Sequence, residues 1–193
     1  MEKILTLDNV NKHFGETKVI DDFSFSVNEG ELRCLLGPNG AGKTTSLDLI
    51  TGRQPITSGS IKFKNNDITK MQEHQRVRLG IGRKFQVPAV FKDLTVKDNF
   101  EVSFGKNKGP FYNIFQGKDS KNDDRFSEII ELVGLQDKLS QVAGFLSHGE
   151  TQWLEIGMVL MQDPQLLLMD EPTAALTEQE TAKTSEIFNK LKG

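Results

Sequence analysis

Apolar and polar residues alternate over short runs in the first third of the chain, which is the pattern of half-buried strands. The clearest run is residues 23–27, and shorter examples at residues 4–7 and 61–63 lie next to turn residues. Residues 32–36 are mostly apolar and stop at Gly37, so we expect a buried strand there. This part of the chain therefore predicts strands joined by turns.

Helical spacing of the apolar residues replaces this pattern in the middle of the chain. Thr95 is suited to cap a helix over residues 96–102, and residues 126–133 carry an apolar stripe with helical spacing. Residues 105–124 are polar, rich in Gly and Lys, and without a clear period. We interpret them as a loop between two helices.

Further elements are indicated by local signals. Residues 43–50 have apolar positions with helical spacing, and residues 166–169 are an apolar run that predicts a buried strand. Two segments have the residue types of a capping box: residues 69–72 before a helix, and residues 177–180 before the last helix. Strands and helices are thus mixed along the chain, which favours an α/β fold.

A Gly-rich segment between the strand and the helix predicted at its two ends matches G-x-x-x-x-G-K-[ST]. Glycines let successive backbone N–H groups turn toward a phosphate, and the helix N-terminus adds partial positive charge. In such a loop Lys43 reaches the β- and γ-phosphates, and the Thr44 hydroxyl ligates Mg²⁺. The alternative is a Gly-rich turn with an exposed lysine. The residues assigned to nucleotide binding are Gly37, Pro38, Asn39, Gly40, Ala41, Gly42, Lys43, Thr44 and Thr45.

Two carboxylates follow the apolar run at residues 166–169. Next to a phosphate-binding loop, Asp170 at the strand end is placed to hold the Mg²⁺ shell, and Glu171 to deprotonate an attacking water. A strand that ends in a solvated acidic turn is the alternative. The two motifs together predict a site for a nucleotide and Mg²⁺. Kinases, GTPases and motors share such a loop, so the loop alone does not say what is done with the nucleotide.

Composition narrows the class of protein further. The chain has 193 residues, 36% of them hydrophobic, which suits a globular domain with a core. With 24 basic and 27 acidic residues, its net charge of −3 argues against a generic nucleic-acid binder. Cys34 is the single cysteine, so no intrachain disulfide can form. Its apolar runs are too short to span a bilayer.

A third motif, residues 146–150, carries a family resemblance. Leu-Ser-His-Gly-Glu resembles the signature sequence of ATP-binding-cassette (ABC) ATPases, whose usual form is Leu-Ser-Gly-Gly-Gln. The resemblance implies that Ser147 and Gly149 close over ATP bound to a second subunit, so that two chains sandwich two nucleotides. The alternative is that Ser147 only caps the helix that follows.

Other residues stand where this family has functional positions. Gln86 follows a strand predicted over residues 81–85 and resembles the Q-loop glutamine, which implies contact with the Mg²⁺ and water site. The resemblance thus gives Glu171, Lys43 and Gln86 catalytic roles, with Thr44, Gln86 and Asp170 serving Mg²⁺. Phe14 takes the place of the aromatic that stacks on adenine, although an apolar strand-end residue is the plainer interpretation. Residues 174–177 correspond to the D-loop.

The resemblance also implies an architecture and a setting. It predicts an α/β core with a mixed sheet over residues 1–87 and 161–193, and an inserted helical subdomain over residues 88–160. The protein would work with a second ATPase subunit, identical or paralogous, and with transmembrane permease subunits on the cytoplasmic face of the cell membrane. Coupling to the permease would run through residues 87–93. No nucleic acid is expected as a partner.

Residues 82–88, 91–99 and 146–157 are similar to the ATP-binding subunit of urea importers, within the branched-chain amino-acid importer group. His148 and Trp153 contribute most to this similarity. The resemblance implies uptake of a small polar solute, with urea first and a branched-chain amino acid as the alternative. A soluble ABC ATPase of repair or translation usually has two cassettes or a long coiled-coil insertion, and neither is present. A catalytically incomplete nucleotide-binding fragment is a further alternative.

Three departures from the family pattern matter. Glu150 replaces the usual signature glutamine, and Thr177 stands where the D-loop usually has aspartate. The family also carries a switch histidine after the final helix, whereas His13, His74 and His148 all precede Asp170. The resemblance therefore implies that this chain is a C-terminally truncated part of a longer protein.

Overall fold

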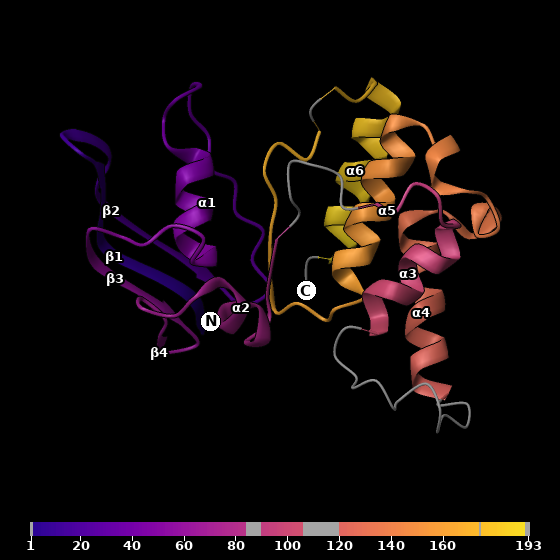
Figure 1. The fold of residues 1–193 in the computed structure, drawn as a ribbon, viewed down its shortest axis with the longest axis horizontal. Helices are drawn as coiled ribbons and strands as arrows, with labels where there is room; N and C mark the ends of the chain where they lie inside the picture. The colour runs from indigo at the N-terminus through magenta and orange to yellow at the C-terminus, as the bar shows by residue number, and fades with distance from the viewer. Residues whose placement is uncertain (1, 84–89, 106–119, 174, 192–193) are drawn as a thin grey trace. The chain divides into compact units, whose positions relative to one another are not determined.

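The computed structural model describes residues 2–83, 90–105, 120–173 and 175–191. The chain forms two compact units, one of residues 1–81 with 191–193 and the other of residues 82–190 (Figure 1). Each unit has its own core and its own share of the predicted site. They are described one at a time.

A four-stranded antiparallel sheet dominates the first unit, in the order β2-β1-β3-β4. On the central strand, Leu7 pairs with Phe25 on one side and Ile61 on the other. The strands predicted at residues 4–7, 23–27 and 61–63 are confirmed. The strands of the sheet are β1 (Lys3–Phe14), β2 (Thr17–Asn28), β3 (Ser58–Phe63) and β4 (Asn66–Asp67).

Strands β1 and β2 extend further than the sequence pattern predicted, because irregularities interrupt the alternation of buried and exposed residues. The pairing register shifts between Leu7 and Val10. Asn9 and Asp22 have positive φ angles of 46° and 48°, and the Asn9 amide donates to the Asp22 carboxylate over 2.5 Å. Beyond such a bulge the side chains change face, so a strict two-residue period ends although the strand continues.

Two helices accompany this sheet. Helix α1 (Lys43–Thr51) confirms the helix predicted at residues 43–50. Helix α2 (Glu73–Arg78) begins later than expected, because its capping box is formed by Gln72 and Gln75. The box predicted at residues 69–72 is wrong, since the Thr69 hydroxyl instead accepts the N–H of Ile61 over 2.9 Å.

A buried arginine holds α1 and α2 together. The Arg76 guanidinium donates to the carbonyl oxygens of Leu49 and Ile50 over 2.7 and 2.9 Å, where α1 ends. It also donates to the carbonyls of Met71 and Thr69. Because a helix leaves its last carbonyls without intrahelical partners, one side chain here satisfies several of them.

The strand predicted at residues 32–36 is wrong. This segment has no regular secondary structure, and Leu32 and Leu36 are 52% and 93% exposed. An apolar run forms a strand only where another strand offers its N–H and C=O groups. None of the four described strands of the first unit pairs with residues 32–36.

The second unit is mostly helical (Figure 1). A two-stranded sheet of β5 (Ile81–Arg83) and β6 (Leu166–Leu168) accompanies the helices and confirms the strand predicted at residues 166–169. Two short 3-10 turns lie at Gln136–Lys138 and Ala143–Phe145. The helices are α3 (Val96–Gly105), α4 (Ser120–Val133), α5 (His148–Leu160) and α6 (Glu178–Leu191).

Helix α5 lies at the centre of the helical core and packs on α6 (Figure 1). The Trp153 indole N–H donates to the Thr184 hydroxyl over 3.0 Å, and the Lys183 ammonium lies 3.8 Å from the centre of the indole ring. On its other side α5 contacts α3 closely at Gly157, where a Cβ atom would lie 2.5 Å from the Phe100 ring. The direction of α5 is therefore fixed by close packing along its length.

The predicted caps of the helical unit are largely confirmed. Thr95 accepts the N–H of Asp98 at the start of α3.

The loop predicted over residues 105–124 is wrong at both ends, because Gly105 belongs to α3 and residues 120–124 belong to α4. The sequence of this first turn of α4 contains no apolar residue, so it gave no helical period. Residues 106–119 lie outside the described residues.

Candidate functional site

The Gly-rich segment of the first unit leads directly into α1. Gly40 and Gly42 both have φ angles of 82°, a left-handed conformation that favours glycine. A Cβ atom at Gly42 would lie 2.6 Å from the Ile20 side chain and 3.1 Å from the Val19 carbonyl oxygen. The backbone of the loop is therefore packed against the first half of β2, and only glycine fits at residue 42.

The N-terminus of α1 has the properties of an anion site. No side chain caps it at Gly42, and its first turn contains no acidic residue. The first N–H groups of a helix need acceptors from outside the helix, and the helix dipole favours a negative one. These features fit a phosphate group, so the residues present agree with the nucleotide predicted for this loop.

The Lys43 ammonium bends back over the loop. It donates to the carbonyl oxygens of Gly37 and Pro38 over 2.8 and 2.9 Å. Thr44 and Thr45 follow in the first turn of α1 and are half-buried. A cation and a set of helix N–H groups thus face the same short loop, which is the donor set that phosphate oxygens require.

Phe14 lies in the same unit, at the end of β1. Its ring is 47% exposed, and the Lys12 ammonium lies 4.6 Å from the centre of the ring. In the hairpin, Phe14 pairs with Thr17, and β2 then continues to the residues that contact Gly42. The structure therefore places the exposed ring on the hairpin that supports the phosphate loop, and the stacking of adenine on Phe14 stays a prediction.

Asp170 lies in the second unit, just after β6. Its side chain is 5% exposed, and one carboxylate oxygen lies 3.9 Å from a guanidinium nitrogen of Arg83 on the paired strand β5. The Arg83 side chain is equally buried. Arg83 was not predicted as a neighbour of Asp170, because the pair depends on two strands that lie far apart in the sequence.

Glu171 has an unusual backbone conformation. It follows Asp170 with a φ angle of 45°, and the residue is exposed. Non-glycine residues with positive φ are uncommon and often occur at functional sites, where the rest of the fold holds them. Asn9 and Asp22 share a positive φ, so the catalytic role of Glu171 stays a prediction.

The signature residues begin α5. Ser147 caps the helix, because its hydroxyl accepts the N–H of Glu150 over 3.2 Å, and the Glu150 carboxylate accepts the N–H of Ser147 over 2.9 Å. The Lys138 ammonium lies 2.5 Å from the other carboxylate oxygen. Partial burial raises the pKa of Glu150, but the bonds from Lys138 and Ser147 outweigh it and keep the pKa below its ordinary value. Because Glu150 stands in place of the usual signature glutamine, the start of α5 carries a carboxylate that is paired with Lys138.

The predicted site residues are divided between the two units. Phe14 and the loop at residues 37–45 belong to the first, and Ser147, Gly149, Asp170 and Glu171 to the second. Gln86 lies outside the described residues, as does residue 174 of the segment assigned to the D-loop. Among the described residues, no cluster of three or more His, Cys, Asp or Glu side chains is arranged to hold a metal ion.

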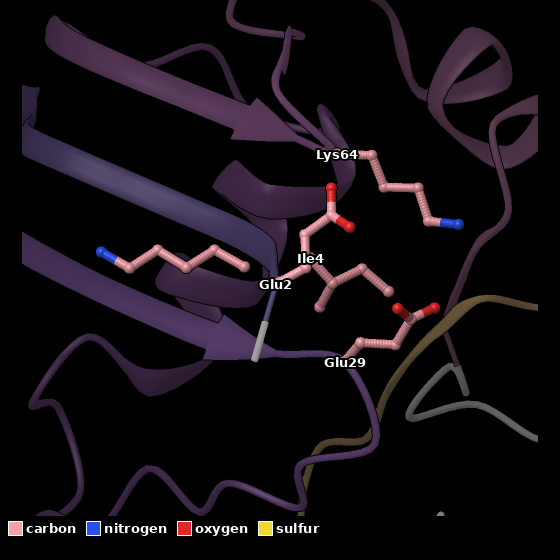
Figure 2. A pocket seen from close by; sticks show the side chains of 5 residues that line it. Glu2, Ile4, Glu29 and Lys64 are labelled. Atoms are coloured by element: carbon pink, nitrogen blue, oxygen red, sulfur yellow. The ribbon is translucent and has the colours of Figure 1, made fainter.

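A small pocket on the first unit does not belong to this site. It is lined by Glu2, Lys3, Ile4, Glu29 and Lys64 at the ends of the sheet strands (Figure 2). The backbone N–H of Glu29 donates to the carbonyl oxygen of Glu2 over 2.9 Å, which closes one side. None of the predicted site residues lines this pocket.

The comparisons with known proteins decide the family. A sequence model described as ABC transporter matches residues 20–174, which is most of the chain. The chain belongs to the ABC transporter family. It is an ATPase that binds ATP with Mg²⁺ and couples hydrolysis to transport. ATP-binding subunits of ABC transporters work as dimers with transmembrane permease subunits. No described helix is long and apolar enough to cross a membrane.

Several relatives carry transport names. LivG of Methanocaldococcus jannaschii, named for branched-chain amino acid transport, is 36% identical over 172 residues, covering 86% of this chain and 67% of that protein. PhnC of Fusobacterium nucleatum, named for phosphonate import, is 33% identical, covering 99% of this chain and 78% of that protein. LptB of Escherichia coli K12, named for lipopolysaccharide export, is 32% identical, covering 86% and 66%.

A solved structure agrees with the fold. A nucleotide-free ATP-binding cassette from an ABC transporter superposes with a TM-score of 0.82 at 33% identity, covering 98% of this chain and 77% of that one. The predicted α/β fold class of an ABC ATPase is therefore confirmed. The predicted boundaries at residues 87, 88, 160 and 161 stay a prediction.

Proposed function

We propose that this chain is the ATP-hydrolysing subunit of an importer for a small polar solute, acting from the cytoplasmic face of the membrane. The observation that carries the ATPase part is the uncapped N-terminus of α1 with the Lys43 ammonium over its loop. The names of LivG and PhnC support transport of small polar solutes, whereas the name of LptB describes export of a lipopolysaccharide.

The phosphates would be held in the first unit. The N–H groups at the start of α1 would donate hydrogen bonds to the phosphate oxygens, and Lys43 would leave the two loop carbonyls for the β- and γ-phosphate oxygens. Phe14 would stack on adenine. Thr44, Gln86 and Asp170 are the residues proposed to hold Mg²⁺. When bound, Mg²⁺ offsets negative charge on the phosphates.

Glu171 is proposed as the general base. A carboxylate accepts the proton of the attacking water as the water forms its bond to the γ-phosphorus and ADP leaves. The exposure of Glu171 supports this role, because an exposed carboxylate can reach a water. Gln86 is proposed to orient the same water and to pass changes at the nucleotide to residues 87–93, which would contact the permease.

The second subunit is proposed to complete each site. Ser147 and Gly149 at the start of α5 would contact the γ-phosphate of ATP held by the partner's loop. The partner is a second copy of this chain or a paralogous ATPase subunit. Hydrolysis would then need two chains together, even though each chain carries its own loop and its own Glu171.

Urea is the first solute that we propose, and a branched-chain amino acid is the second. The sequence similarity to urea importers rests most on His148 and Trp153. In the structure Trp153 packs against α6 and His148 lies beside the Gln152 amide. The similarity to LivG supports the second solute.

An uptake assay separates the two solutes. In cells that produce the protein, we expect the Glu171→Gln variant to lower uptake of labelled urea at least tenfold and to leave labelled leucine uptake unchanged. Loss of leucine uptake with intact urea uptake would reverse the order of the two solutes. Unchanged uptake of both would contradict the proposed importer function for these substrates.

A further inference from the structure

The N-termini of α5 and α6 meet at one carboxylate. Glu180, in the first turn of α6, accepts the N–H of Thr177 over 3.0 Å and its hydroxyl over 2.9 Å. The same carboxylate lies against Gly149 in the first turn of α5, where a Cβ atom would overlap it. Glu180 therefore caps α6 and also lies against the first turn of α5.

The start of α5 differs from the start of α1 in its charge. No side chain caps α1, and no carboxylate lies in its first turn. At α5, Ser147 and Glu150 form a capping box, and the Glu180 carboxylate from α6 lies against Gly149. Lys138 pairs with Glu150 at 2.5 Å, whereas Glu180 takes its hydrogen bonds from Thr177. The anion-binding capacity of α5 is thus already used within the chain.

We propose that Glu180 occupies the phosphate position of the signature helix and is displaced by the partner's ATP when two subunits close. This inference rests on the proposed function, in which Gly149 contacts that ATP. The Glu180 carboxylate and a phosphate cannot both lie against Gly149, and a carboxylate beside a phosphate is repelled when water is excluded. Glu180 acts here as a positioning residue, because it competes for a binding group without touching the reacting atoms.

The displacement has a structural consequence in the same chain. Glu180 also holds Thr177, at the end of the segment assigned to the D-loop. When the partner's phosphate takes the place beside Gly149, the carboxylate leaves α5 and its hydrogen bonds with Thr177 change. In this way, binding of ATP across the interface changes the position of the residues that follow Glu171. This provides a physical link between the signature segment and the D-loop segment.

The test uses ATP-dependent dimer formation in the Glu171→Gln background, where bound ATP persists. Sedimentation of the full chain with Mg²⁺ gives the ATP concentration at half-maximal dimer. We expect Glu180→Gln to lower that concentration about tenfold, since a neutral amide is easier to displace than a carboxylate. The control is Glu178→Gln, an exposed residue of the same helix turn that makes the same charge change. It should leave the concentration unchanged.

A purely structural role for Glu180 predicts the opposite direction. Loss of a cap destabilises α6 and would raise the ATP concentration needed, or leave it unchanged. Either result would overturn the proposal. Glu180→Asp, which keeps the charge but is too short to span Thr177 and Gly149, is the second variant if the amide variant does not fold. We expect it also to lower the concentration.

The same experiment distinguishes failure of the proposed function from failure of the Glu180 proposal. If the Glu171→Gln chain binds ATP but never dimerises, the two-subunit arrangement is wrong, and the role of Glu180 falls with it. If that chain dimerises and Glu180→Gln does not lower the ATP concentration, the dimer stands and only the displacement of Glu180 is wrong.

Discussion

Replacing Glu171 by Gln is expected to reduce ATP turnover at least 100-fold while ATP binding is retained. An amide cannot accept the proton of the attacking water, and loss of a general base typically costs a factor of about 10² to 10⁴ in rate. The phosphate loop lies in the other unit of the chain, so it keeps its donors. Turnover is measured as phosphate release with Mg²⁺, and binding as the Kd for ATP.

The shape of Gln is close to that of Glu, so the variant also keeps the backbone conformation after Asp170. Glu128→Gln on α4, an exposed residue, is the matched control and should leave turnover unchanged. Turnover of the Glu171 variant within a factor of about two of the unchanged chain would assign the general base to another group.

Replacing Lys43 by Ala is expected to weaken ATP binding about 10- to 100-fold. The ammonium is the cation of the loop, and a hydrogen bond between charged groups contributes about 1.5–3 kcal/mol. Its present bonds to the carbonyls of Gly37 and Pro38 show that the side chain reaches over the loop. The Kd for ATP, measured by calorimetry, gives the effect directly.

Two controls make this result specific to the loop. Lys70→Ala removes the same charge from an exposed position and should leave the Kd for ATP unchanged. Thermal unfolding of the Lys43 variant should match that of the unchanged chain without nucleotide. An unaltered Kd in the folded variant would contradict the assignment of residues 37–45 to phosphate binding.

The features that the sequence predicted best are those that depend on neighbouring residues. The start of α1, the Ser147 cap of α5 and the Thr177 box of α6 each follow from residue types within a few positions, and the structure has all three. Local hydrogen bonds need no distant partner to be recognised. The family motifs share this property, because each is contiguous in the chain.

The features that were missed depend on residues far apart in the sequence. Arg83 and Asp170 come together only because β5 pairs with β6, and Glu180 reaches Gly149 only because α6 packs on α5. The prediction of a strand at residues 32–36 was wrong for the same reason, because an apolar run does not determine which strand will pair with it. No local pattern contains this information.

The central claim is that this chain is an ATPase whose sites are completed by a second chain. The most direct measurement is ATP hydrolysis with Mg²⁺ over a range of protein concentrations, expressed as the rate per chain. Two chains around two nucleotides predict a rate per chain that rises with protein concentration and then levels off, because Ser147 and Gly149 come from the partner. Hydrolysis at a constant rate per chain, independent of protein concentration down to high dilution, would contradict the account.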